Sequence, residues 1–370
     1  MVPLLPLPRL IFGAGSLTAL KAELTFLGVQ RPLLMSDNGL ERAGLVAKAA
    51  DVMPAATEQF LEIPENPTAE GADSAYARYR DAKCDGIVAL GGGSVIDSAK
   101  VVAAMAAGGV TRAAELLGKP DSIRDGVAPL IAIPTTVGTG SESSPAAGLH
   151  PNGHARAIGT RSSRLVPRVA ICDPDLARTL PPRLIAATGI DALSHCIEGF
   201  FAEPANPIVD ALALDGITRA FASVRAATEP NGDAARADLM AAAFAGGAAI
   251  HKGLGPAHAV ANVCGDQGLH HGVLVAVALP FTVALVARHA IDKAERVAVA
   301  LGVERVADIP GVLREMNHAL GMPATLREAG YRPGSVDEMA DGMARSHFNL
   351  TSPYVPTRNE YYEIVQSLLN

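Results

Sequence analysis

Hydrophobic and polar positions follow different patterns in the two halves of the chain. Up to about residue 180, short apolar runs with many β-branched residues alternate with longer helical patterns, and each run ends at a turn signal. This alternation predicts βαβ units and a parallel sheet. The expected strands are Arg9–Phe12, Pro32–Ser36, Gly86–Leu90, Leu130–Pro134 and Arg168–Asp173.

After Leu180 the pattern changes to long, alanine-rich amphipathic segments with little that is typical of strands. The expected helices are Arg183–Phe201, Ile208–Arg225, Ala234–His251 and a segment from Ala257 onward. Pro181 and Pro182 interrupt any continuing helix, so the boundary is expected near them. The sequence therefore predicts an α/β domain over residues 1–180 and a helical domain over residues 181–370.

Composition narrows the function classes. The chain has 370 residues, 49% of them hydrophobic, and a formal net charge of −7 without a run of Lys and Arg. Nucleic acid is therefore not an expected partner. The longest apolar run, Val273–Ala287, is too short to span a bilayer and contains Pro280, so a buried core helix is expected there and no membrane segment.

Cellular location is also an expectation from sequence. The apolar stretch Met1–Phe12 lacks the basic start and the cleavage site of a secretory signal, which favours the cytoplasm. The four cysteines contain no CxxC pair and are expected to be free thiols in a reducing compartment: Cys84, Cys172, Cys196 and Cys264.

A glycine run marks the first candidate binding site. Gly91-Gly92-Gly93-Ser94 follows an apolar strand directly and precedes a helical pattern that begins at Val95. Glycines let a phosphate approach the backbone, and the N–H groups and dipole of the helix N-terminus attract its charge. The alternative is a tight turn that binds nothing, but the strand and helix context favours an anion site.

A second loop, Pro134–Glu142, follows the next predicted strand and is rich in hydroxyls and glycines. Its alternative interpretation is a polar loop with a helix cap at Thr139 or Ser141. Loops that follow two parallel strands face the same edge of the sheet, where open α/β sheets bind nucleotides. Asp37 ends another strand and is a candidate for the ribose diol, which slightly favours NAD over NADP, although it can equally cap the next helix.

Acidic and imidazole side chains suggest a metal site in the second half. Asp191 and His195 are four residues apart and so share one helix face. The alternative is that Thr188 caps the helix, Asp191 completes a capping box and His195 is a core histidine. Four of the ten histidines fall within 21 residues downstream: His251, His258, His270 and His271. Two of these imidazoles would complete a shell of three nitrogens and one oxygen suited to Fe(II) or Zn(II).

With these residues in hand, the chain resembles the iron-containing (group III) alcohol dehydrogenase family over essentially its whole length. The resemblance rests on Gly91–Lys100 (GGGSVIDSAK), Pro134–Glu142 (PTTVGTGSE), Gly189–Gly199 (GIDALSHCIEG) and Gly253–Gly272. It implies a Rossmann-like dinucleotide-binding domain, an all-helical domain of the kind found in dehydroquinate synthases, a metal in the cleft between them, and a homodimer.

The resemblance also implies roles for individual residues. The implied metal ligands are Asp191, His195, His258 and His271. The implied cofactor contacts are Gly92, Gly93, Ser94, Asp97, Thr135, Thr136 and Thr139, with Asp37 at the adenosine ribose. His270 is the alternative fourth ligand, because the interval from His258 is slightly shorter than the family pattern.

One departure concerns proton transfer. Many family members carry a second histidine four residues after the one that matches His258, and this chain has Asn262 there. His251 lies seven residues before His258, and helical spacing would place it near the same face. His251 and Asn262 are therefore the candidate catalytic positions, with His251 as the replacement imidazole.

The expected activity is hydride transfer between NAD, with NADP less favoured, and a small alcohol or aldehyde, with Fe(II) or alternatively Zn(II) as a Lewis acid. Alternatives on the same fold are a metal-free reductase similar to maleylacetate reductases, a glycerol dehydrogenase or other reductase, a synthase or lyase that recycles its nucleotide, and a binding protein without chemistry. Asp191 favours a metal, because the metal-free reductases usually lack an acidic residue at this position.

Overall fold

The structure is a computed structural model that describes residues 6–151 and 156–370. The described residues up to Thr136, together with Gly140–Leu180, form an α/β unit. Val137–Thr139 and Pro181–Asn370 form a helical unit. The three residues 137–139 thus leave the sheet unit and pack with the helices, which the sequence did not predict.

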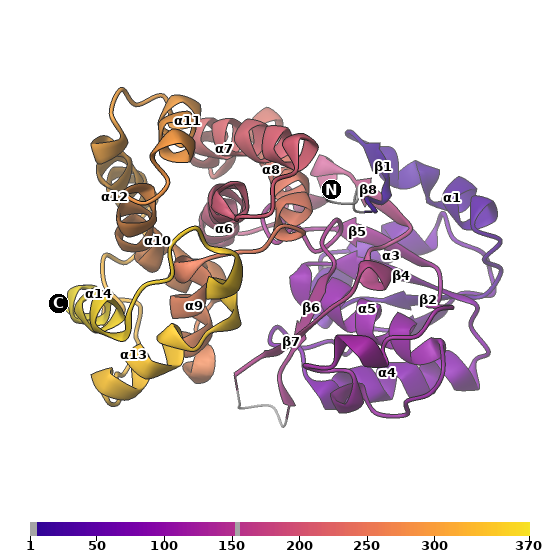
Figure 1. Cartoon of the computed structure of the whole chain (residues 1–370). Helices are drawn as coiled ribbons and strands as arrows, with labels where there is room; N and C mark the ends of the chain where they lie inside the picture. Colours follow the sequence, from indigo (N-terminus) through magenta and orange to yellow (C-terminus); the bar gives the residue numbers. More distant parts are fainter. Residues whose placement is uncertain (1–5, 152–155) are drawn as a thin grey trace. The chain divides into compact units, whose positions relative to one another are not determined.

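The α/β unit contains a parallel sheet of six strands in the order β1-β8-β5-β4-β2-β3 (Figure 1). Its strands are β1 (Arg9–Phe12), β2 (Pro32–Met35), β3 (Glu58–Phe60), β4 (Gly86–Gly91), β5 (Leu130–Pro134) and β8 (Val169–Cys172). The parallel sheet confirms the predicted fold class, and all five predicted strands are present, with ends that differ by at most one residue.

Helices cover both faces of this sheet because alternate residues of each strand point to opposite sides. Val88 and Leu90 of β4 join a core with the first helices of the chain, whereas Ile87 and Ala89 join a second core with α4 and α5. The α-helices that the structure describes in this unit are α1 (Leu20–Phe26), α2 (Asn38–Arg42), α3 (Leu45–Ala50), α4 (Ala69–Asp81) and α5 (Gly93–Ala106), and the short helix η1 (Ser16–Ala19) precedes α1. Burial on both faces explains why the central strands are continuous apolar runs.

Three strands were not predicted from sequence. β3 has three residues, and a separate antiparallel pair is formed by β6 (Ala146–Leu149) and β7 (Ile158–Arg161). These strands are short and contain glycine, alanine or charged residues, so they give no apolar run. Their identity comes from pairing with a neighbour and not from propensity.

The helical unit is built around one buried helix, α6. Its α-helices are α6 (Pro182–Phe201), α7 (Pro207–Ala227), α8 (Asp233–Ile250), α9 (Pro256–Val263), α10 (His271–Ala287), α11 (Ile291–Leu301), α12 (Ile309–Ala319), α13 (Val336–Ala344) and α14 (Arg358–Leu369). Helices α7, α8 and α10 pack directly against α6. The all-helical second half confirms the prediction, and Val273–Ala287 lies in the buried helix α10 as expected.

Small residues allow the helices to approach α6 closely. A Cβ atom at Gly246 of α8 would lie 2.9 Å from the Cβ of His195, and one at Gly199 of α6 would lie 2.6 Å from the Cβ of Ala249. By length and composition α6 passes as a membrane-spanning helix, but 94% of its apolar window is buried inside the unit. The apolar character of α6 is accounted for by its place in the core.

Candidate functional site

The glycine run forms the predicted turn between strand and helix. β4 ends at Gly91, which pairs with Pro134 at the end of β5, so the two candidate loops start side by side. Gly92 is the N-cap of α5 and provides no side chain to the first N–H groups of the helix. A Cβ at Gly91 would lie 2.5 Å from Val95 Cγ2, and one at Gly92 would lie 3.0 Å from Thr136 Cγ2. Glycine is therefore required for this geometry, which leaves backbone N–H groups available to an anion.

Other predicted cofactor residues are engaged within the α/β unit. The Ser94 hydroxyl donates to the carbonyl of Glu65. Asp97 accepts hydrogen bonds from Gly148 N, at 2.9 Å, and from the Ser141 hydroxyl. Thr135 is buried, and its N–H donates to Gly91 O at 3.1 Å. The contact of Asp97 with Ser141 and that of Thr135 with Gly91 join the two loop segments, so part of the motif shapes the site.

Thr136 and Thr139 belong to different units. Thr136 Oγ1 is buried and has no hydrogen-bond partner among the described residues, so a donor or acceptor from a ligand would satisfy it. Thr139 lies in the segment that packs with the helices, where a Cβ at Gly138 would be 1.9 Å from the carbonyl oxygen of Thr188. The alternative helix cap at Thr139 or Ser141 is wrong, because no helix begins there.

Lys100 is a buried charged residue whose role in holding the second loop could not be seen from the sequence pattern. Lys100 is fully buried, and its Nζ donates to Ser144 O at 3.0 Å and to Ala146 O at 2.7 Å. Burial lowers the pKa of Lys100 to about 8, against the opposing charge of Asp97, which lies 3.8 Å away. Lys100 follows Asp97 by three residues on α5, and this spacing was the available sequence signal.

Asp37 is the N-cap of α2, as its alternative interpretation held. Its Oδ1 accepts hydrogen bonds from Gly39 N at 2.7 Å and from Leu40 N at 2.9 Å. Both capping bonds go to the same carboxylate oxygen. A ribose contact is compatible with this geometry and stays a prediction.

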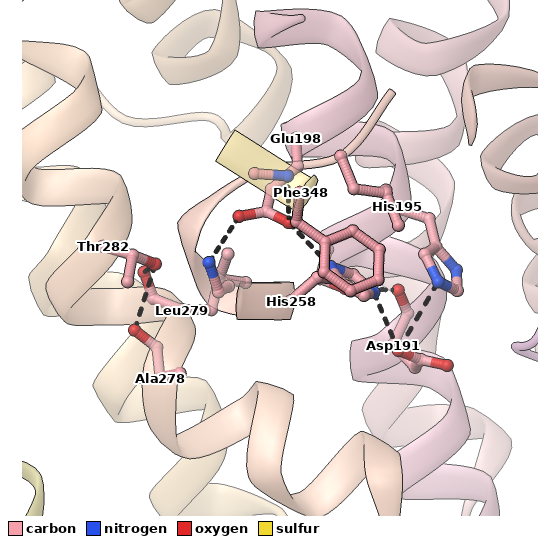
Figure 2. A network of polar contacts seen from close by, with 12 residues as sticks. Asp191, His195, Glu198, His258, Ala278, Leu279, Thr282 and Phe348 are labelled. Atoms are coloured by element: carbon pink, nitrogen blue, oxygen red, sulfur yellow. Dashed lines mark hydrogen bonds and ion pairs between the residues drawn. The ribbon is translucent and has the colours of Figure 1, made fainter. Parts of the chain in front are cut away.

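The candidate metal ligands meet at one carboxylate oxygen. Asp191 and His195 are one turn apart on α6, His258 is on α9, and His271 is the first residue of α10. The Asp191 Oδ1 atom lies 3.7 Å from His195 Nε2, 3.9 Å from His258 Nε2 and 3.9 Å from His271 Nε2. Figure 2 shows Asp191 between His195 and His258. His270 is instead the N-cap residue of α10.

Local packing explains how these elements converge. α6 begins at Pro182, so Thr188 is inside the helix and its hydroxyl donates back to Leu184 O at 2.8 Å. The alternative in which Thr188 caps the helix is therefore wrong. A Cβ at Gly272 would lie 2.4 Å from Ala187 O, so only glycine lets the start of α10 reach α6. This close approach brings His271 to Asp191.

The arrangement fits a divalent metal ion. Asp191, His195 and His258 are each at least nine-tenths buried, and one potential ligand atom from each lies within 4.8 Å of the others. Asp191 Oδ1 and His258 Nε2 have no hydrogen-bond partner among the described residues. Two ligands of a tetrahedral ion with bonds of about 2.1 Å lie about 3.4 Å apart. This is a few tenths of an ångström less than the 3.7 to 3.9 Å between Asp191 Oδ1 and the three imidazole nitrogens.

Protonation also favours metal binding. Burial, together with the neighbouring imidazole of His258, lowers the pKa of His195 to about 3. His195 is therefore neutral at physiological pH, which is the form that coordinates a metal. His271 completes the set from a half-exposed position, with 47% of its side chain accessible. A ligand set of three imidazoles and one carboxylate suits Fe(II) or Zn(II).

The spacing argument for His251 is wrong. α8 ends at Ile250 and α9 begins at Pro256, so no continuous helix joins His251 to His258. His251 is buried at the end of α8, with 5% of its surface exposed, and it is outside the group of three potential ligands. Asn262 lies on α9, one turn after His258, and is half-buried.

Two further residues border the metal ligands. Glu198 is buried on α6, and its Oε2 lies 2.6 Å from His258 Nδ1. Burial alone would lower the pKa of His258, but the hydrogen bond and the charge of Glu198 raise it above its usual range. The Phe348 ring lies 5.7 Å from the His258 ring, centre to centre, at an angle of 49° between the ring planes, and both rings are labelled in Figure 2. Glu198 follows His195 by three residues, a spacing visible in the sequence.

Comparison with known proteins matches both units. The model for iron-containing alcohol dehydrogenase covers residues 8–174, and that for the C-terminal part of the Fe-containing alcohol dehydrogenase family covers residues 185–369. A 4-hydroxybutyrate dehydrogenase from Cupriavidus necator is 39% identical over 374 residues, 97% of each chain. The probable alcohol dehydrogenase EutG of Salmonella typhimurium is 33% identical over 88% of this chain and 84% of its own. The crystal structure of a 1,3-propanediol oxidoreductase is 26% identical, covers 99% of this chain and all of its own, and gives a TM-score of 0.92.

Proposed function

Because the chain belongs to the iron-containing alcohol dehydrogenase family, we propose that it uses NAD and one divalent metal ion to interconvert a short alcohol and its aldehyde. That it is an oxidoreductase acting on alcohols follows from the family and its named relatives. The observation that carries the metal is the convergence of three imidazole nitrogens on Asp191 Oδ1, at 3.7 to 3.9 Å.

Asp191, His195, His258 and His271 would hold the ion, which we propose to be Fe(II), with Zn(II) as the alternative. When bound, the ion would supply a Lewis acid for the substrate oxygen, and NAD would accept or supply the hydride. The half-exposed side of the set at His271 leaves access for a small molecule. Phe348 presents an apolar ring beside His258, which suits the carbon chain of a short alcohol.

The α/β unit would bind the dinucleotide. The N–H groups at the start of α5 offer hydrogen bonds to a pyrophosphate, and its positive dipole end favours that charge. The proposal includes contacts between the dinucleotide and Gly92, Gly93, Ser94, Thr135, Thr136 and Thr139. Asp97 would position the loop. An acidic Asp37 would repel the 2′-phosphate of NADP, which supports NAD.

Proton exchange needs a side chain that can take up and release a proton. The amide of Asn262 cannot do so, whereas an imidazole can. We therefore assign this role to His251.

The substrate is proposed from the relatives. 4-Hydroxybutyrate is the first candidate, because the relative named for it is 39% identical over 97% of both chains. Propane-1,3-diol and simple primary alcohols follow, from the other matches. A common feature of these candidates is a primary alcohol on a short, flexible carbon chain.

A homodimer is part of the proposal. β1 forms one edge of the sheet among the described residues, and Leu10 and Phe12 on this strand are 41% and 44% exposed. An exposed apolar edge strand is a ready surface for pairing with another chain. Light scattering after size-exclusion chromatography tests this: a dimer that Leu10→Lys converts to a monomer would support it, and a monomeric wild type would contradict it.

The decisive experiment follows NADH optically. Anaerobically purified protein is assayed with the alcohols and aldehydes named above, before and after chelation and after addition of Fe(II) or Zn(II). We expect activity that chelation removes and that one of the two ions restores, whereas Asp191→Ala stays inactive with either. Activity that survives chelation, or an Asp191→Ala protein as active as the wild type, would contradict the proposal.

A further inference from the structure

The carboxylate of Glu198 makes three hydrogen bonds to one short segment of the helical unit. The segment is Gly255–His258, where α9 begins. Glu198 Oε2 accepts from Gly255 N at 3.0 Å and contacts His258 Nδ1 at 2.6 Å, while Oε1 accepts from Ala257 N at 2.7 Å. Figure 2 shows the carboxylate reaching from α6 to this turn.

This carboxylate replaces a conventional helix cap. The N-cap residue of α9 is Gly255, which has no side chain, and the first residue is Pro256, which has no N–H group. The remaining N–H groups of the first turn need acceptors from elsewhere. Glu198 supplies one to Gly255 and one to Ala257, and its negative charge lies at the positive end of the α9 dipole.

The same carboxylate fixes the orientation of His258. A hydrogen bond from Nδ1–H to a carboxylate selects the tautomer whose lone pair is on Nε2. His258 Nε2 is buried, has no hydrogen-bond partner among the described residues and lies 3.9 Å from Asp191 Oδ1. When His258 is neutral, its lone pair is thus on the atom that faces the other metal ligands.

We propose that Glu198 is a positioning residue for the metal: it holds the start of α9 and the ring of His258 so that Nε2 is directed to the ion. The inference rests on the proposed function, because it assumes that His258 is a ligand. Asp191, His195 and Glu198 are then three functional residues on one face of α6, at intervals of four and three residues.

Gly255 is the necessary companion of Glu198. A Cβ at Gly255 would lie 2.9 Å from Glu198 Oε1 and 3.1 Å from its Cδ. The φ angle of Gly255 is −153°, which any residue can adopt, so the requirement for glycine is one of space only. An alanine at this position would displace the carboxylate while leaving its charge in place.

The apolar surroundings of Glu198 strengthen the hydrogen bonds of its carboxylate. A small pocket next to it is lined mainly by apolar side chains, among them Ile197, Leu254 and Leu279. Water has little access to Glu198, which is 6% exposed. Hydrogen bonds to a carboxylate are stronger where the surroundings have a low dielectric constant.

The test measures metal affinity without turnover. Metal-free protein is titrated with Co(II) in competition with a chelator, and binding is followed by the visible absorption of the ion. Glu198→Gln keeps the size of the side chain but loses one acceptor, and we expect its dissociation constant to rise 10- to 100-fold, the range for residues that orient a ligand. Gly255→Ala is expected to weaken binding in the same direction.

A matched control separates positioning from general destabilisation. Asn206 is a buried residue of the same unit that caps α7 by accepting from Val209 N, and it touches none of the metal ligands in the described contacts. Asn206→Ala should lower the melting temperature but leave Co(II) affinity as in the wild type. Equal Co(II) affinity in wild type and Glu198→Gln, or an equal loss in Asn206→Ala, would overturn the inference.

Two further readouts keep the outcomes distinct. Nitrogen NMR of protein labelled at histidine reports the His258 tautomer, and the Nδ1–H form is expected in the wild type but not as the dominant form in Glu198→Gln. If Glu198→Gln does not fold, Gly255→Ala carries the test alone, with unchanged affinity counting against positioning. A wild type that binds no Co(II) would refute the proposed metal as well, whereas a binding wild type with a neutral Glu198→Gln refutes only the role of Glu198.

Discussion

The buried carboxyl group of Glu142 gives a pH-dependent stability that can be worked out from the structure. Glu142 is 1% exposed, and its Oε1 has no hydrogen-bond partner among the described residues. Burial raises its pKa from 4.5 to about 7, although its own backbone N–H and the charge of Lys100 act in the opposite direction. The folded state therefore keeps a proton that the unfolded state has lost between these two pH values.

The sign and size follow from proton linkage. Where the folded state binds the additional proton, raising the pH destabilises it, so Glu142 lowers the free energy of unfolding progressively from pH 4.5 to about 7. At about 1.4 kcal/mol for each pH unit, the full loss is about 3 kcal/mol, of which about 2 kcal/mol falls between pH 5 and pH 7.5. Glu142→Gln carries no titrating group and should escape this loss.

The assay compares urea unfolding of wild type and Glu142→Gln at pH 5 and pH 7.5. Circular dichroism is the appropriate probe because the chain has no tryptophan. An amide donor left without an acceptor shifts the variant by a constant amount, so the informative quantity is the change with pH: Glu142→Gln should gain about 2 kcal/mol relative to wild type. The exposed Glu65→Gln is the control. A difference between Glu142→Gln and wild type that is flat from pH 5 to pH 7.5 would refute the reasoning.

Three other substitutions address the site. Gly272→Ala places a Cβ 2.4 Å from a backbone oxygen of α6, so it should lower the free energy of unfolding by about 1–3 kcal/mol and weaken Co(II) binding. The control is Gly311→Ala, whose Cβ meets nothing within 4 Å and which should be neutral or slightly stabilising. Thermal melts and metal titration check both; a Gly272→Ala protein like the wild type would contradict the packing argument. Phe348→Ala removes the ring beside His258 and should raise kcat/KM for hexan-1-ol relative to ethanol about tenfold, with Co(II) affinity unchanged. His251→Ala should remove the imidazole limb from the pH–rate profile, and an unchanged profile would exclude His251 as the proton relay.

Sequence pattern was sufficient for the elements whose signal is local. Strands β4 and β5 are continuous apolar runs because both faces of the sheet are covered, and the helices of the second half have long amphipathic patterns. β3, β6 and β7 gave no such signal, because they owe their conformation to pairing partners distant in sequence. The separation of 137–139 from its own loop depends on Gly138 meeting the backbone of α6, which no local pattern encodes.

The same distinction applies to the site. Asp191 and His195 could be paired from a four-residue interval, but the pairing says nothing about which distant histidine joins them. The His251 argument failed because it extended helical spacing across a break at residues 251–255. Lys100 and Glu198 were overlooked for a related reason: each is close in sequence to a recognised residue, yet its partners lie 44 and about 60 residues away.

Asp191, His195 and Glu198 lie on one face of α6, whose other buried residues are mainly apolar. Burying Asp191, His195 and Glu198 costs free energy unless each is satisfied. Glu198 is satisfied by three hydrogen bonds from the start of α9, whereas Asp191 Oδ1 is not satisfied by any described residue. Glu198 is thus satisfied within the protein, whereas Asp191, two turns earlier on α6, would be satisfied by a cation. A fold that tolerates this imbalance gains a preorganised metal site, since the ligands are held by helix packing before the ion arrives.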